Sequence, residues 1–190
     1  TGYSNTGGFG IDGSLSTVIG AALCHPDRLY YCVLGDLAFF YDMNALGNRH
    51  VPSNIRILVV NNGLGFEMKF PASWGYSIAN SIGVSEDNYV CAAGHYSSPD
   101  LIKSYVYGLG FEYLKVSPKD QYFDCLPKIV SNEKQDRTLV VEIVVNSENE
   151  DAALNLIGSI MVDESNAAKA AIKKAIGKKG IDAIKKMMGR

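Results

Sequence analysis

The 190-residue sequence lacks several features that would place it in a specialised class of protein. It has no apolar run near the roughly 18 residues that a membrane-spanning helix needs. Its four cysteines (Cys24, Cys32, Cys91 and Cys125) form no Cys-x-x-Cys pair, and its three histidines are scattered. These absences argue against a membrane protein, a disulfide framework and a zinc site. Because no signal-peptide pattern is present either, we expect a cytoplasmic protein with reduced cysteines.

The composition is that of a globular protein. Hydrophobic residues make up 47% of the chain and charged residues 20%, which provides enough apolar surface for a core. The length fits one large domain or two small ones. The sequence begins with Thr1 in a glycine-rich loop, so we expect it to be part of a longer protein.

Charge is distributed unevenly along the chain. The total is −2, but residues 166–190 contain eight Lys or Arg and one Asp, which leaves −9 on residues 1–165. An acidic body argues against nucleic acid as the main partner. In the basic tail, isoleucines recur at near-helical spacing, which predicts a helix. We expect this helix to pack weakly on the acidic body of the chain or to dock on an acidic partner, and weak association with an anionic membrane surface stays open as an alternative. We therefore expect a domain over residues 1–165 and a helical tail over 166–190.

Short apolar runs alternate with segments of helical periodicity. Strands are predicted at Leu29–Leu34, Ile55–Val60, Phe111–Val116 and Thr138–Val145, with a further short strand at Tyr89–Ala93. Helices are predicted at Ser14–Cys24, Leu37–Arg49, Ser98–Leu109, Gln121–Val130 and Ser147–Ile160. Several strands are apolar on both faces, which is typical of a parallel sheet covered on both sides. The sequence therefore predicts an α/β fold with an open, mostly parallel sheet, helices on both faces and a C-terminal helical tail.

Polar motifs follow two successive predicted strands. Gly35-Asp36 ends the first strand and begins a helix, and Asn61-Asn62-Gly63 ends the second. Ligands of open α/β sheets bind beyond the carboxyl ends of the strands. Carboxylate and amide oxygens suit Mg²⁺, and the N–H groups at the start of a helix suit a phosphate. Each motif alone is usually a helix cap or a turn, but together they predict a Mg²⁺–diphosphate site.

Another motif indicates a different cofactor. Gly8–Gly13 fits the pattern G-x-G-x-x-G, and Asp36 lies 23 residues after Gly13, a spacing that suits dinucleotide binding. This interpretation gives no role to Asn61-Asn62. A dinucleotide-dependent oxidoreductase therefore stays open as an alternative, as does a non-catalytic module of the same fold that serves assembly through its basic tail.

The order Gly35-Asp36, helix, strand, Asn61-Asn62 resembles the motif of thiamine-diphosphate-dependent enzymes, which usually reads Gly-Asp-Gly and closes with Asn-Asn. Residues 5–17 (NTGGFGIDGSLST) and 35–44 (GDLAFFYDMN) are most similar to the 2-succinyl-5-enolpyruvyl-6-hydroxy-3-cyclohexene-1-carboxylate synthases. The resemblance covers about residues 3–157 and implies the diphosphate-binding domain at the C-terminal end of such enzymes. It implies part of a 2-oxo acid decarboxylase or carboligase, a lyase or transferase that uses the cofactor as an electron sink.

The resemblance also implies the residues of a cofactor site. The side chains of Asp36 and Asn62 and the backbone carbonyl of Leu64 would bind Mg²⁺. The other residues expected at the cofactor are Ile11 under the thiazolium ring, Leu37 and Ala38 with backbone N–H groups toward the diphosphate, and Gly35, Gly65 and Phe66.

The resemblance further implies that this site is completed by another domain. In this family the Glu that activates the cofactor belongs to a pyrimidine-binding domain, for which these residues offer no candidate. We therefore expect no catalytic residue in this sequence, no activity of the chain alone, and a homodimer or larger assembly in which the same or a second chain supplies that domain.

Two positions depart from the synthases. Thr6 replaces an Arg that binds the acid substrate, and Ala38 replaces a Ser that contacts the diphosphate. The change at Thr6 predicts poor use of 2-oxoglutarate with isochorismate, and a preference for another 2-oxo acid.

Overall fold

The computed structural model describes residues 1–4, 10–63, 65, 78, 81–83, 98–117, 119–133 and 135–160. The chain divides into two compact units, Thr1–Ser147 and Glu148–Arg190. The boundary that we expect after residue 165 lies outside the described residues, so that boundary and the tail helix stay predictions. None of the helices in the described part of the chain combines the length and the apolar composition of a membrane span.

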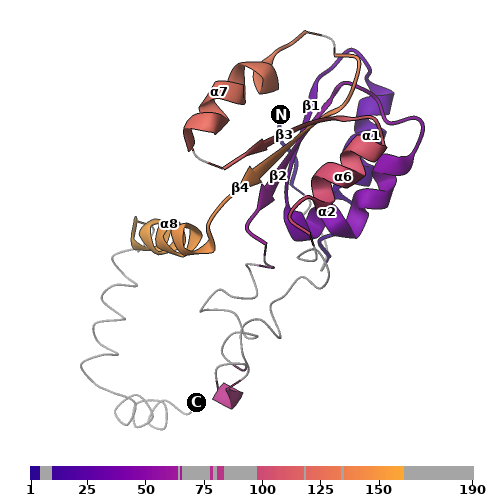
Figure 1. Ribbon diagram of the computed structural model, residues 1–190. Coiled ribbons are helices and arrows are strands. Elements are labelled where there is room, and N and C mark those ends of the chain that lie inside the picture. The colour runs from indigo at the N-terminus through magenta and orange to yellow at the C-terminus, as the bar shows by residue number, and fades with distance from the viewer. Residues whose placement is uncertain are drawn as a thin grey trace, which may run out of the picture. The chain divides into compact units, whose positions relative to one another are not determined.

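The first unit contains a parallel sheet with the strand order β1-β2-β4-β3 (Figure 1). Its strands are β1 (Tyr30–Gly35), β2 (Ile55–Asn61), β3 (Glu112–Val116) and β4 (Leu139–Val144). Every neighbouring pair runs parallel. The predicted α/β fold with a mostly parallel sheet is therefore confirmed, whereas the strand predicted at Tyr89–Ala93 lies outside the described residues.

Helices cover both faces of this sheet (Figure 1). The helices of the first unit are α1 (Ser14–Cys24), α2 (Asp36–Asp42), α6 (Leu101–Gly108) and α7 (Lys119–Val130). Ile57 and Val59 of β2 are buried with Phe39 of α2 in a core that α1 and α6 complete. Leu58 points to the opposite face and is buried with Ile129 of α7. This alternation explains why β2 has an unbroken apolar sequence.

The edge strand β1 differs from that pattern. Cys32 and Leu34 are buried on one face, but Tyr31 and Val33 on the other are 46% and 68% exposed. The apolar run at this position predicts a strand buried on both faces, which is wrong for the described part of the chain. Tyr31 still reaches α7, because its hydroxyl donates a hydrogen bond to the Ile129 carbonyl.

The helix predicted at Leu37–Arg49 is shorter and changes type. α2 ends at Asp42, and a 3₁₀-helix, η1 (Met43–Gly47), follows it. Asn44 and Gly47 both have low helix propensity, and the Asn48 N–H bonds back to the Ala45 carbonyl in a tight turn. The helical periodicity alone does not reveal this change.

The second unit begins with most of α8 (Ser147–Ile160), the helix predicted over the same residues. Leu154, Leu156 and Ile157 of this helix are exposed.

Candidate cofactor site

Asp36 begins α2 directly after the last residue of β1. Its side chain is only 1% exposed. Burying a carboxylate is unfavourable unless other charges or hydrogen-bond donors compensate it. The N-terminal end of a helix favours a negative charge, and Asp36 lies in the first turn of α2. The N-terminal end of α2 therefore stabilises the buried carboxylate of Asp36, the residue that the sequence predicts as a Mg²⁺ ligand.

Gly35 occupies an open position beside Asp36. Its backbone angles, φ −73° and ψ 162°, are accessible to any L-residue. Among the described residues, no atom outside its chain neighbours lies within 4 Å of where a Cβ on Gly35 would stand. Neither backbone strain nor packing in the described part of the chain accounts for a glycine here. Close approach of a ligand to the backbone would account for it.

Asn61, Asn62 and Gly63 form a tight turn at the end of β2. The Gly63 N–H donates a 3.0 Å hydrogen bond to Oδ1 of Asn61, and Gly63 has φ 73°. This positive φ is favourable for glycine and strained for most other residues. The Asn61 backbone carbonyl also accepts a 2.9 Å hydrogen bond from the Val145 N–H, which connects the turn to the chain after β4. The half-buried Asn62 therefore lies between two anchored residues.

The parallel register brings the two motifs to the same edge of the sheet. Gly35 of β1 pairs with Val60 of β2, so Asp36 and Asn62 each follow shortly after paired residues. The backbone N–H groups of Leu37 and Ala38 belong to the first turn of α2 and have no acceptor within that helix. Asp36, Leu37, Ala38 and Asn62 thus lie on adjoining segments, as the sequence predicts.

The other predicted site residues lie partly inside and partly outside the described part of the chain. Ile11 is half-buried in the segment that precedes α1, and Gly65 is buried. Leu64, Phe66 and Thr6 lie outside the described residues. The roles of all these residues in binding Mg²⁺, cofactor or substrate stay predictions.

A polar network lies near this edge of the sheet, and the sequence motifs do not predict it. Glu142 of β4 is 1% exposed, and its register partners are Val59 of β2 and Lys115 of β3. Its Oε1 accepts a 2.7 Å hydrogen bond from Nδ2 of Asn61, and its Oε2 accepts a 2.5 Å hydrogen bond from the hydroxyl of Tyr113. The sequence signal was available, because Glu142 interrupts an otherwise apolar strand.

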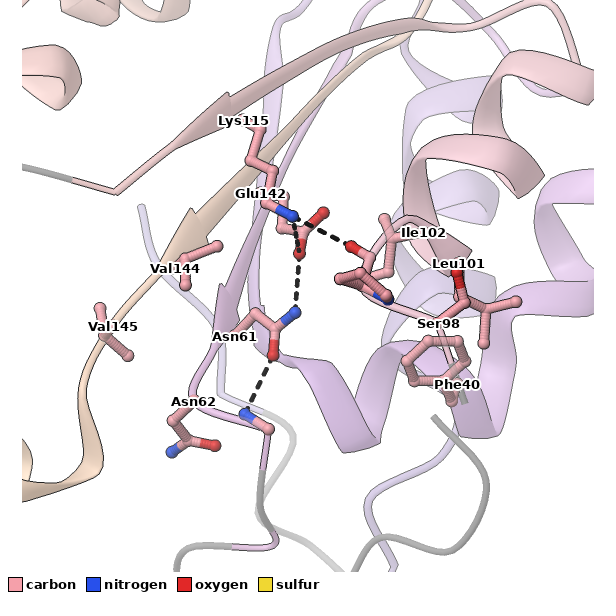
Figure 2. Close-up of a pocket in the computed structure, with 12 residues that line it drawn as sticks. Phe40, Asn61, Asn62, Ser98, Leu101, Ile102, Lys115, Glu142, Val144 and Val145 are labelled. Carbon is pink, nitrogen blue, oxygen red and sulfur yellow. Dashed lines mark hydrogen bonds and ion pairs between the residues drawn. The ribbon is translucent and has the colours of Figure 1, made fainter. Parts of the chain in front are cut away.

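The same network borders a cavity of about 300 Å³ (Figure 2). Phe40, Asn61, Asn62, Lys115 and Glu142 are among the residues that line it. Nζ of Lys115 is 4.0 Å from Oε1 of Glu142 and donates a 3.0 Å hydrogen bond to the carbonyl of Pro99. Burial, and then the hydrogen bond to Glu142, raise the pKa of the Tyr113 hydroxyl, so Tyr113 stays a hydrogen-bond donor to the carboxylate.

The donor set at the sheet edge suits a hard cation. A carboxylate from Asp36, an amide oxygen from Asn62 and phosphate oxygens of a ligand would match the preference of Mg²⁺ for a few protein oxygens plus phosphate. This set differs from a cluster of three or more His, Cys, Asp or Glu, of which the described residues contain none. The residues present therefore fit a Mg²⁺–diphosphate group.

Comparison with known proteins finds relatives of this chain, although no family profile matches it. The chain is 35% identical over 150 residues to the 2-succinyl-5-enolpyruvyl-6-hydroxy-3-cyclohexene-1-carboxylate synthase of Bacteroides thetaiotaomicron. The aligned region covers 79% of this chain and 25% of that protein. It is 36% identical to the synthase of Bacteroides fragilis over 150 residues, again 79% of this chain and 25% of that protein. The synthase of Desulfotalea psychrophila is 58% identical over 60 residues, 32% of this chain and 11% of that protein.

The matched region spans about a quarter of the length of the two Bacteroides synthases. Because the match extends over most of this chain, it is not confined to the short glycine-rich and Asn-Asn motifs. The chain is therefore homologous to part of the 2-succinyl-5-enolpyruvyl-6-hydroxy-3-cyclohexene-1-carboxylate synthases.

Proposed function

We propose that this chain binds the diphosphate end of thiamine diphosphate through Mg²⁺, as the diphosphate-binding domain of a cytoplasmic 2-oxo acid decarboxylase or carboligase. The observation that carries the proposal is the placement of Asp36 and Asn62 after neighbouring parallel strands in a chain related to the synthases. When bound, the cofactor would supply an electron sink for the bond next to the carbonyl of a 2-oxo acid.

The residues of this chain bind and orient the cofactor in this proposal. Asp36 and Asn62 provide oxygen ligands to Mg²⁺, with the carbonyl of Leu64 as a third. The N–H groups of Leu37 and Ala38 donate to the diphosphate, where the positive end of the α2 dipole favours negative charge. Gly35 leaves space for the diphosphate, Gly65 and Phe66 contact the cofactor, and Ile11 supports the thiazolium ring.

The complete active site combines this domain with a pyrimidine-binding domain. The Glu that activates the cofactor would come from that domain, so we propose no catalytic residue in this chain. The domain would be supplied by the same or a second chain, in a homodimer or a larger assembly. The chain without it would not turn over substrate.

The similarity to the synthases favours this function over the dinucleotide interpretation of Gly8–Gly13. Calorimetric titration of the full-length protein separates the alternatives. Binding of thiamine diphosphate that requires Mg²⁺ supports the proposal. Binding of a nicotinamide dinucleotide instead would support an oxidoreductase, and binding of neither cofactor would support a non-catalytic module.

A further inference from the structure

Glu142 is an acidic residue in the middle of the sheet. It interrupts the apolar sequence of β4 and is 1% exposed. A buried carboxylate destabilises a fold unless donors satisfy its oxygens. Tyr113 satisfies one oxygen and Asn61 the other, and Nζ of Lys115 lies 4.0 Å away. An apolar residue would fill this position with a smaller desolvation penalty, so the network calls for a reason beyond stability.

The bond to Asn61 determines which way the Asn61 amide faces. An amide has a donor end and an acceptor end. Because both oxygens of Glu142 act as acceptors here, Nδ2 of Asn61 points toward Glu142 at 2.7 Å. Oδ1 therefore points the other way and accepts the 3.0 Å hydrogen bond from the Gly63 N–H (Figure 2). The carboxylate thus selects the amide orientation that closes the turn.

We infer that Glu142 is a positioning residue for Mg²⁺ binding: through Asn61 it holds the Asn61–Gly63 turn in the shape that presents Asn62 to the cation. This inference rests on the proposed function, because it assigns Asn62 to the metal. Without the carboxylate, the Asn61 amide is free to rotate and the Gly63 N–H loses its acceptor. Asn62 then loses one of the two anchors that surround it. Mutation of residues that orient metal ligands in this way typically lowers metal affinity about 10–100-fold.

A purely structural role for Glu142 makes a different prediction. In that case, every change that weakens the buried network would lower stability, and Mg²⁺ affinity would follow stability. Tyr113→Phe is the matched control, because it removes the hydrogen bond to Oε2 and leaves the Oε1–Asn61 contact in place. Positioning through Asn61 predicts that this variant loses stability but keeps its Mg²⁺ affinity.

The test is a calorimetric titration of Mg²⁺ into the full-length protein with thiamine diphosphate present, with thermal unfolding followed by circular dichroism. Glu142→Leu should weaken Mg²⁺ binding at least about tenfold. Glu142→Gln should bind Mg²⁺ within about threefold of the wild-type affinity. The side-chain carbonyl of the glutamine can face Asn61 while its NH₂ group faces the hydroxyl oxygen of Tyr113. Tyr113→Phe should likewise stay within about threefold, since it does not touch the Asn61 contact.

A double variant tests whether Glu142 acts through Asn61. Asn61→Ala should weaken Mg²⁺ binding about as much as Glu142→Leu, and the double variant should be no weaker than Asn61→Ala alone. Wild-type affinity in Asn61→Ala would overturn the inference even if Glu142→Leu failed to fold. Wild-type affinity in a folded Glu142→Leu would also overturn it while leaving the proposed function intact. If the wild-type protein bound no Mg²⁺ with thiamine diphosphate, the proposed function and this inference would both fail.

Discussion

The carboxylate of Asp42, at the end of α2, accepts two hydrogen bonds from Ser16 in the first turn of α1. The Ser16 backbone N–H lies 2.7 Å from Oδ2, and the Ser16 hydroxyl lies 2.6 Å from Oδ1. One of the unsatisfied N–H groups of a helix N-terminus is therefore capped by a side chain from another helix. This link connects α1, which follows the segment carrying Ile11, to the helix that begins at Asp36.

Removing this link should destabilise the fold. Asp42 is 8% exposed, and Asp42→Ala leaves the Ser16 N–H without its acceptor. We expect a loss of about 1–3 kcal/mol in the free energy of unfolding, measured by urea denaturation. Ser16→Ala keeps the backbone bond and should lose only about 1 kcal/mol. Equal stability of Asp42→Ala and wild type would show that the link contributes nothing.

Cys32 should make the folded state less stable at alkaline pH. Burial, and then the nearby charge of Asp42, raise the pKa of the Cys32 thiol from 9.0 to about 11. The folded state therefore holds the neutral thiol at a pH where the unfolded chain ionises, and stability should fall as the pH rises from about 9 to about 11. Denaturation across this range should show a smaller decline in Cys32→Ala, and an unchanged decline would exclude Cys32 as a cause.

The burial of Cys32 can also be tested by chemical labelling. Cys24 is exposed and Cys32 is buried. Iodoacetamide should therefore modify Cys24 much faster than Cys32 in the folded protein. Cys32 is less accessible, and its raised pKa leaves less of the thiolate, which is the reactive form. Peptide mass spectrometry assigns the sites, and comparable rates at Cys24 and Cys32 would contradict the described burial.

Gly35→Ala should separate stability from cofactor binding. The backbone angles suit alanine and the described neighbours leave room for its Cβ, so stability should be unchanged or higher by about 0.4–1 kcal/mol. Affinity for thiamine diphosphate should fall, because the methyl group would occupy the space assigned to the diphosphate. Gly108→Ala in α6, another glycine with open space around it, is the control and should leave affinity unchanged. Unchanged affinity in Gly35→Ala would remove Gly35 from the site.

The residue at position 6, Thr6, leads to a prediction about the preferred substrate. Loss of an Arg that binds a carboxylate through charge-assisted hydrogen bonds costs about 1.5–3 kcal/mol, or roughly ten- to a hundredfold in affinity. Full-length enzyme should therefore use 2-oxoglutarate with isochorismate poorly, and Thr6→Arg should improve that reaction. A panel of 2-oxo acids assayed for CO₂ release, with and without isochorismate, tests this. Efficient use of 2-oxoglutarate with isochorismate by the wild type would contradict the role given to Thr6.

The sequence predicts most of the fold because local patterns and burial agree. Ile55–Val60 is β-branched and apolar and forms a central strand, and Ser14–Cys24 forms a helix over the predicted residues. The apolar run of β1 does not distinguish an edge strand from a central one, because apolar side chains such as Val33 also occupy exposed positions. The exposure of Val33 depends on where α7 packs, which short-range periodicity does not encode.

The candidate site is predicted less completely. Asp36 and Asn62 stand out because polar residues follow apolar strands at successive ends. The role of Glu142 depends on the register that places it near Asn61, 81 residues away in the chain. Likewise, Asp42 binds Ser16 across 26 residues of sequence. Such contacts arise from strand order and helix packing, so residue types and spacing alone do not predict them.

Titration of Mg²⁺ into full-length protein that carries Asp36→Asn tests the central claim most directly. The substitution keeps the shape of the side chain and removes the negative charge assigned to the cation. Asp120→Asn, at an exposed acid in the first turn of α7, is the matched control. With thiamine diphosphate present, we predict that Asp36→Asn loses Mg²⁺-dependent binding by at least about tenfold while Asp120→Asn and wild type bind equally. Wild-type affinity for Mg²⁺ and thiamine diphosphate in a folded Asp36→Asn protein would contradict the account.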